Sequence, residues 1–374
     1  MLILAATLAI LVYGLIAPML GALLPTYGLD SGQQGTLGMI QALGLVVSSL
    51  SAGPVIDKQG NKLALVVGLF LVAASLFGAP NAGGYVGLLV VYFVLGVGGG
   101  IVVTGANSLV GAVEPTRRGS ALNFLNLFFG LGGIITTYAA SYLLTPVVLC
   151  YSVAALTVVA LGVNAATKMP GPSGETSFRL DEAPKLLATP ALILLSLFLF
   201  LYVSCEVGVW NWLKTYLISI NFDPKKAGGV VSYGFAFGIL VGRVVVSRVL
   251  VKVPALTVTL ASAVLIAVTT FIMLRLSSET AITIAVFCAG LSMAPVFPTT
   301  LAIVGDTFRR GTATAMGVAI TCGWIGLAFS SRIIGFLHET TSLGNALLLI
   351  PTFAVLMIVI NLILRSVVKR PVTA

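Results

Sequence analysis

Charge is the scarcest property of this chain. Charged residues make up 8% of its 374 residues, whereas soluble globular proteins carry about 25%. Hydrophobic residues make up 58%, and the mean hydropathy is +1.11. Such a composition cannot supply a water-facing surface, so an aqueous globular fold is excluded. Long polar stretches are scarce too, which leaves no room for a separate soluble domain.

Cysteine and histidine are also few. The four cysteines, Cys150, Cys205, Cys288 and Cys322, stand in apolar surroundings without metal-ligand spacing or a disulfide pattern. We therefore expect them to be small hydrophobic residues. The single histidine, His338, has no second histidine that could complete a zinc site, and a surface position is expected for it. The sequence predicts no metal site and no cofactor.

What the chain does contain is twelve stretches long enough to cross a bilayer, where one span needs roughly 20 apolar residues. Met1–Leu24 is interpreted as the first span and not as a cleaved signal peptide, because it lacks a basic start and a small-residue cleavage site. The class is therefore an all-α, multi-pass integral membrane protein. The predicted spans are 2–24, 33–54, 62–79, 85–113, 119–143, 146–167, 191–219, 226–250, 254–275, 280–305, 311–336 and 343–367.

The spans divide six and six around a polar segment. We predict an N-terminal six-helix bundle at 1–167, a cytoplasmic linker with a short amphipathic helix at 168–190, and a C-terminal six-helix bundle at 191–374. The fourth and tenth spans each lead to an acid, Glu114 and Asp306, which is followed three residues later by a pair of arginines. Such a pseudo-repeat is typical of transporters whose substrate site lies between two halves.

The formal net charge of +9 is interpreted as an orientation signal. If Met1 is placed inside, 15 of the 20 lysines and arginines fall on the inner side, which predicts that both termini are cytoplasmic. A bacterial inner (plasma) membrane is the expected location. The bilayer is the expected partner, with some attraction to anionic lipid, and nucleic acid is not.

The segment Gly53-x-x-x-Asp57-Lys58-x-Gly60-Asn61-Lys62 follows the second span and is predicted to form a tight charged turn. It resembles the signature loop of the major facilitator superfamily, although Asn61 stands where that family usually has arginine. The resemblance implies the major facilitator fold: twelve transmembrane helices in two pseudo-symmetric six-helix bundles. It also implies a gating role, in which Asp57 caps a neighbouring helix while Lys58 and Lys62 bridge to the partner half and lock the outward-facing state.

Within that superfamily, four segments resemble the fucose-permease branch of sugar porters, which includes fucose, glucose and galactose:proton symporters. Segment 201–217 has a Tyr-Val-x-x-Glu…Trp…Tyr-Leu pattern, and 295–299 has a Phe-Pro-Thr element. Segments 104–107 and 123–130 fit the same branch.

Two positions depart from that branch. Proton-coupled members carry an aspartate in span one and a glutamate in span four, where this chain has Gly21 and Val103. No acid is predicted inside the membrane in the first half. The departures argue against proton symport by the branch's usual route and favour facilitated diffusion.

Glu206 is the only carboxylate predicted well inside the hydrocarbon region, where an ionisable side chain costs about 2.5–3.5 kcal/mol on insertion scales. It is interpreted as a substrate acceptor or an ion-coupling site, with a structural ion pair to Arg332 in span eleven as the alternative. Trp210 lies one turn further on the same helix face. An indole beside a carboxylate can hold a sugar, but Trp210 could also belong to an interfacial aromatic belt.

Amides and a further indole complete the predicted binding residues. Asn107, Asn126, Asn123 and Gln41 offer both donors and acceptors, which suits a neutral polyol, and Trp324 could form an aromatic wall. The alternative is hydrogen bonding between helices, typically worth about 0.6 kcal/mol in membrane proteins, and core packing for Trp324.

Span ten contains Pro295 and Pro298, which remove two backbone donors and should break or kink the helix. A broken helix is tolerated where it lines a cavity, so these prolines are candidate gating residues. Arg243 is read as a charge of the inner gate.

The sequence thus predicts a secondary transporter, not an enzyme, that moves a small neutral polar solute, a monosaccharide being favoured, by alternating access. It is expected to work as a monomeric facilitator. The alternatives are a proton- or sodium-coupled sugar symporter that uses Glu206, and an efflux transporter of amphipathic compounds. A membrane receptor or lipid-handling protein without solute flux is the alternative from another class.

Overall fold

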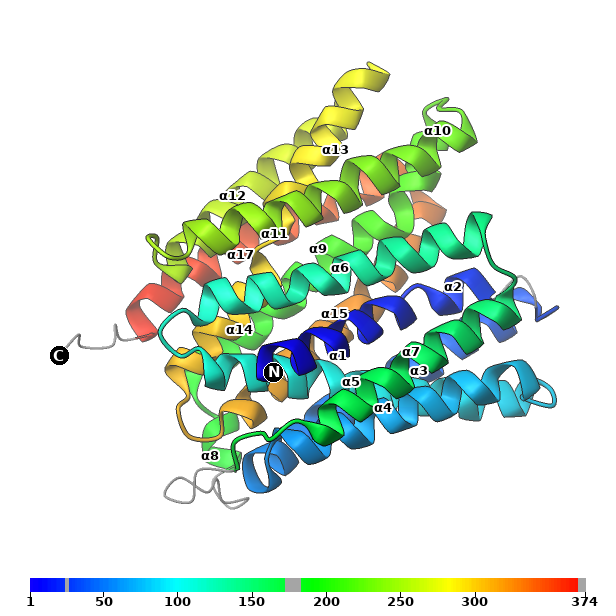
Figure 1. Cartoon of the computed structure of the whole chain (residues 1–374). Helices are drawn as coiled ribbons and strands as arrows, with labels where there is room; N and C mark the ends of the chain where they lie inside the picture. Colours follow the sequence, from blue (N-terminus) through cyan, green and yellow to red (C-terminus); the bar gives the residue numbers. More distant parts are fainter. Residues whose placement is uncertain (24–26, 172–182, 369–374) are drawn as a thin grey trace. The chain divides into compact units, whose positions relative to one another are not determined.

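The structure is a computed structural model that describes residues 1–23, 27–171 and 183–368 (Figure 1). In this part of the chain, helices joined by short connections make up the fold, with no β-strand. Eleven helical segments of the described part are long and apolar enough to cross a membrane, and α1, with 15 residues, is a shorter apolar helix that precedes them. The all-α, twelve-span architecture predicted from hydropathy is confirmed.

The chain forms two compact units. The first comprises Met1–Ala183 and Phe308–Thr321, and the second comprises Pro184–Thr307 and Cys322–Ala374. The predicted division into bundles at 1–167 and 191–374 stays a prediction, and Phe308–Thr321, which falls in the predicted second bundle, groups with the first unit. Much of the predicted linker lies outside the described residues. Its described part contains α8 (Ala183–Leu187), a helix of only five residues.

In the first unit, α5 packs along both α3 and α4, while α1 packs against α6 and α4 packs against α7. Apolar side chains and glycines line these contacts, so close van der Waals packing holds the helices together in the membrane. The elements are α1 (Leu2–Ile16), α2 (Met19–Leu23), α3 (Ser31–Gln59), α4 (Asn61–Gly78), the 3₁₀-helix η2 (Ala79–Asn81), α5 (Tyr85–Val113), α6 (Arg118–Tyr142) and α7 (Pro146–Ala166).

In the second unit, α12 packs against α13 and α17, α11 packs against α13, and α9 packs against α17. The helix α15 begins in the first unit and continues in the second. The elements are α9 (Pro190–Ser219), α10 (Pro224–Gly229), the π-helix η5 (Val230–Ala236), α11 (Phe237–Val249), α12 (Ala255–Met273), α13 (Glu279–Met293), α14 (Val296–Thr307), α15 (Thr312–Thr340), α16 (Leu343–Ala346) and α17 (Leu349–Val367).

The turn predicted over residues 53–62 was wrong in its extent. Helix α3 continues through Pro54 to Gln59, and α4 begins at Asn61, so Gly60 alone separates the two helices. Gly60 has φ +88°, a conformation that glycine adopts without the steric penalty of a side chain. Proline removes one backbone donor from a helix, but here the helix persists around it because Gly53 and Ile56 pack closely against α15 and its neighbours.

Two other prolines interrupt helices. The first predicted span is divided after Ile16, where Ala17-Pro18 separates α1 from α2. The tenth is divided at Ala294-Pro295, between α13 and α14. The break expected from Pro295 is therefore present, whereas Pro298 lies within the first turn of α14, where a missing N–H is tolerated.

Candidate functional site

One face of α9 carries a polar and aromatic stripe. Tyr202, Glu206 and Trp210 follow each other at intervals of four residues, so their side chains project from the same face of the helix. Their accessibility increases along the stripe: Tyr202 is fully buried, Glu206 is half-buried, and Trp210 is 40% exposed. The carboxylate and the indole predicted from the sequence are thus accessible side by side.

A buried cation lies beside this stripe. Arg243 of α11 is only 3% exposed, and its guanidinium interacts electrostatically with both Glu206 and Tyr202. The Tyr202 hydroxyl lies near the Glu206 carboxylate, although it forms no hydrogen bond of ordinary distance and angle with the described residues. A buried guanidinium is costly unless a negative charge is close, and Glu206 supplies that charge.

The structure does not bring Arg332 to Glu206. The Arg332 side chain is exposed, and no ion pair joins the two residues within the described part of the chain. The cation that acts electrostatically on Glu206 is Arg243, which comes from a different helix, α11. The inner-gate role predicted for Arg243 stays a prediction; the structure places its guanidinium where it interacts with Glu206 and Tyr202.

Trp210 meets another aromatic ring edge-on. Its ring centroid lies 5.1 Å from that of Phe235 in η5, with an interplanar angle of 77°. With this contact in place the indole remains 40% exposed, which leaves surface for stacking on a ligand. Trp324 is half-buried in α15, within the second unit.

Two predicted amides meet in the first unit. Asn107 of α5 and Asn126 of α6 are 0% and 3% exposed, and Asn126 Nδ2 donates a hydrogen bond to Asn107 Oδ1 at 2.9 Å. Asn126 Nδ2 also donates to the Leu122 carbonyl at 2.9 Å, and Asn107 Nδ2 donates to the Val103 carbonyl at 2.8 Å. The pair therefore links α5 to α6 inside the unit.

The other predicted polar residues of the first unit are more dispersed. Asn123 is fully buried and donates from Nδ2 to the Gly119 carbonyl at 2.9 Å. Gln41 of α3 is half-buried. Thr104, which the sequence did not single out, is fully buried one turn before Asn107, and its hydroxyl has no hydrogen-bond partner among the described residues. It adds unused polar capacity to the α5 face that carries Asn107.

Asp57 lies at the end of α3 and caps the first turn of α15. Its carboxylate accepts hydrogen bonds from the backbone N–H groups of Ala313 and Thr314 at 3.1 and 2.8 Å. All three residues belong to the first unit. Lys58 and Lys62 are exposed, and the bridging role that the family resemblance implies for them stays a prediction.

The residues missed by sequence reasoning are Tyr202 and the partnership of Arg243 with Glu206. Tyr202 could have been found from its spacing of four residues before Glu206. The proximity of Arg243 had no sequence signal, because it depends on how α9 and α11 are rotated against each other. Within the described part of the chain, no three histidine, cysteine or acidic side chains are grouped so that they could hold a metal ion.

The chain is similar to known proteins in both sequence and fold. The family model described as the Major Facilitator Superfamily matches residues 2–331. The chain is 23% identical to the Saccharomyces cerevisiae Bypass of stop codon protein 6, over 91% of this chain and 78% of the yeast protein. It is 27% identical to the Staphylococcus aureus Quinolone resistance protein NorA, over 61% of this chain and 60% of NorA.

Among solved structures, the fold resembles that of a variant of the E. coli fucose:proton symporter, FucP. The TM-score is 0.83, and the similarity covers 98% of each chain. The sequence identity is 17%, so this likeness establishes the fold and leaves the solute open.

Proposed function

Because this chain belongs to the Major Facilitator Superfamily, a family of transporters, we propose that it moves a small neutral polar solute, a monosaccharide in the favoured case, by alternating access. The observation that carries the proposal is the α9 stripe. Glu206 and Trp210 are accessible one turn apart, so a ligand can give its hydroxyl hydrogens to the carboxylate while its apolar face stacks on the indole.

The charge balance of the stripe supports a neutral solute. Glu206 has a resident cation in Arg243, so a ligand does not need to bring a positive charge of its own. The same balance supports facilitated diffusion, since no transported cation is required to offset Glu206. Gly21 and Val103, at the positions of the acids of proton-coupled porters, support it as well.

The test is uptake of labelled monosaccharides, including fucose, glucose, galactose and xylose, into proteoliposomes with and without an imposed proton or sodium gradient. Saturable flux of at least one sugar, independent of both gradients, is expected. Accumulation driven by one gradient would retain the sugar assignment but replace the facilitator by a symporter. If none of the sugars is transported under any condition, the proposal is wrong.

The similarity to a quinolone resistance protein favours efflux of amphipathic compounds as the second candidate. The same proteoliposomes, loaded with a fluorescent quinolone, separate the two. We expect no protein-dependent quinolone flux, because a carboxylate with its own arginine offers little extra attraction to a cationic drug. Quinolone flux in the absence of sugar flux would make efflux the favoured function.

We further propose that the protein is a monomer in a bacterial inner membrane, with both termini cytoplasmic. The excess of lysine and arginine on one side of the predicted topology supports the orientation. Cysteines introduced at the exposed residues Lys225 and Lys58 would report it with a membrane-impermeant thiol reagent on intact cells. Labelling at position 225 but not at 58 is expected, and the reverse pattern would invert the topology.

A further inference from the structure

The second unit contains a cavity of about 490 Å³ at the end where α9 and α12 terminate. Its polar lining comes from three parts of this unit: Tyr216 and Ser219 of α9, Arg275 after α12, and His338, Ser342 and Asn345 around the end of α15. A cavity of this size falls in the range of small-molecule sites. Tyr216 follows Glu206 by ten residues, which is about 15 Å along the helix, so the cavity is separate from the α9 stripe.

The described lining of this cavity carries a positive charge on Arg275 and no carboxylate. Arg275 and His338 face it, and none of the described residues that line it is an acid. The Arg275 guanidinium lies 5.3 Å from the centroid of the Phe271 ring, which holds it by a cation–π contact, and it is close enough to act electrostatically on Tyr216. Its positive charge has no carboxylate partner within the described part of the chain.

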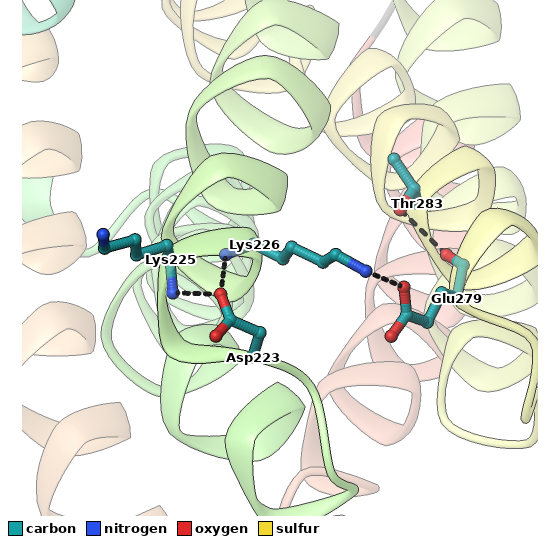
Figure 2. A network of polar contacts seen from close by, with 5 residues as sticks. All are labelled: Asp223, Lys225, Lys226, Glu279 and Thr283. Carbon is teal, nitrogen blue, oxygen red and sulfur yellow. Dashed lines mark hydrogen bonds and ion pairs between the residues drawn. The ribbon is translucent and has the colours of Figure 1, made fainter.

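Glu279, an acidic residue near this end of the unit, already forms an ion pair with a lysine. Glu279, four residues after Arg275, pairs through Oε2 with Lys226 Nζ at 3.1 Å (Figure 2). Asp223 is also occupied, because its Oδ1 accepts hydrogen bonds from the backbone N–H groups of Lys225 and Lys226. The positive charge of the cavity is therefore not neutralised by these acids.

Neutral donors surround the two basic groups. The Ser342 oxygen accepts a hydrogen bond from the Asn345 backbone at 3.3 Å, and its own hydrogen is left to donate. The exposed Asn345 side chain adds an amide. Donors supplied by three segments of the unit suit the several oxygens of a phosphate better than a planar carboxylate, which a single arginine fork can satisfy.

We propose that this cavity binds a phosphate-bearing anion, held by Arg275 and His338. The position of the cavity suits a lipid headgroup: it lies at the end of α9, and this helix of 30 residues is about 45 Å long, which exceeds a hydrocarbon core of about 30 Å and allows a helix end to lie at headgroup level. A soluble organic phosphate presents the same chemistry. The inference does not depend on which solute the protein transports.

The test uses the purified, delipidated protein in neutral detergent and follows its thermal unfolding. One arm titrates phosphatidylglycerol against phosphatidylcholine in mixed micelles, and the other titrates glycerol 3-phosphate. Variants are the double substitution Arg275→Gln with His338→Ala, and Arg275→Lys, which keeps the charge but loses the planar fork. The matched control is Lys225→Gln, which removes a positive charge at the same end of the unit from a side chain that does not line the cavity.

We expect phosphatidylglycerol to raise the melting temperature of the wild type and Lys225→Gln alike, with an apparent affinity at least tenfold above that of phosphatidylcholine. The double variant should lose at least tenfold in that affinity, and Arg275→Lys should fall between. Stabilisation by glycerol 3-phosphate at similar concentrations would identify a soluble phosphate as the ligand instead of a lipid. If the double variant does not fold, the apparent affinity of Arg275→Lys for phosphatidylglycerol tests the proposal. Undiminished stabilisation of the cavity variants, or equal stabilisation by both lipids, would overturn the proposal.

Discussion

Asp57 and Thr314 are 257 residues apart in the sequence, yet they form a helix cap inside the first unit. Asp57 Oδ2 accepts hydrogen bonds from the Thr314 backbone N–H at 2.8 Å and from the Thr314 hydroxyl at 2.6 Å. The first N–H groups of a helix have no partner within that helix, and a carboxylate also interacts favourably with the positive end of the helix dipole. Asp57 therefore does for α15 what an N-cap residue ordinarily does, but from another helix.

Asp57→Asn is expected to weaken this cap. Asparagine keeps the size of the side chain but has one acceptor oxygen instead of two and no charge. Loss of a capping side chain typically costs about 0.5–2 kcal/mol, and a decrease in this range is expected in thermal unfolding followed by tryptophan fluorescence. The control is Lys58→Gln, because the neighbouring Lys58 side chain is exposed. Equal melting temperatures for the two variants would mean that the cap does not stabilise the protein.

Gly53→Ala should disturb the same junction through sterics. A Cβ at Gly53 would lie 2.5 Å from the Thr314 Cα and 2.6 Å from the Ala313 carbonyl oxygen, and backbone atoms cannot move aside as a flexible side chain can. Overpacking of this kind typically costs about 1–3 kcal/mol, so a clear fall in melting temperature is expected.

The matched control for that substitution is Gly35→Ala in the same helix. A Cβ at Gly35 meets no atom within 4 Å, and such a change typically stabilises by about 0.4–1 kcal/mol because it restricts the unfolded chain. A Gly53→Ala protein as stable as Gly35→Ala would show that α3 and α15 can separate here without loss.

The spans could be predicted from the sequence because a bilayer admits few alternatives to a long apolar helix. The residue at which α3 ends could not be predicted from the sequence. Gly53-Pro54 followed by charged residues indicates a turn by local rules, but the helix continues to Gln59 because its last turns pack against Ala313 and Ala64. The contact with Ala313 joins residues far apart in the sequence, so no local pattern could reveal it.

The candidate site shows the same limit. Glu206 and Trp210 could be singled out from residue type and helical spacing alone. Arg332 was considered as an alternative partner of Glu206 because of its estimated depth, and depth does not specify the side of a helix from which a residue projects. The π-helical segment η5 precedes Arg243 and adds a residue to a turn, which rotates α11 relative to a continuous α-helix. The direction in which Arg243 projects thus depends on a feature that hydropathy does not report.

A double-mutant cycle between Glu206 and Arg243 should show strong coupling. Glu206→Gln removes the negative charge that acts on the buried Arg243 guanidinium, and removing one member of a buried charge pair typically destabilises by about 3–5 kcal/mol. The half-exposure of Glu206 should bring the effect toward the lower end of that range. Adding Arg243→Gln should recover part of the loss, because the uncompensated charge is removed. The coupling energy is measured from thermal or denaturant unfolding of the four proteins.

The matching cycle between Glu206 and Arg332 is the control. Arg332 is exposed and forms no ion pair with Glu206, so the two substitutions should be additive within about 0.3–0.5 kcal/mol, as expected for residues that do not interact. Coupling in this cycle but not in the Arg243 cycle would restore Arg332 as the partner of Glu206.

The pair of Asn107 and Asn126 allows binding to be separated from packing. Both hydrogens of the Asn126 amide nitrogen are used, one on Asn107 Oδ1 and one on the Leu122 carbonyl. Asn126→Ala should therefore lower stability, by about 1–3 kcal/mol if the buried Asn107 oxygen is left without a donor, while the KM for the transported solute changes less than twofold. The control is Asn81→Ala, which removes an exposed amide that donates to the Phe77 carbonyl and the Tyr151 hydroxyl, outside the buried pair. If Asn126→Ala instead raised KM tenfold at unchanged melting temperature, the amides would contact the solute during transport, and the hydrogen bond between them would have to open in each cycle.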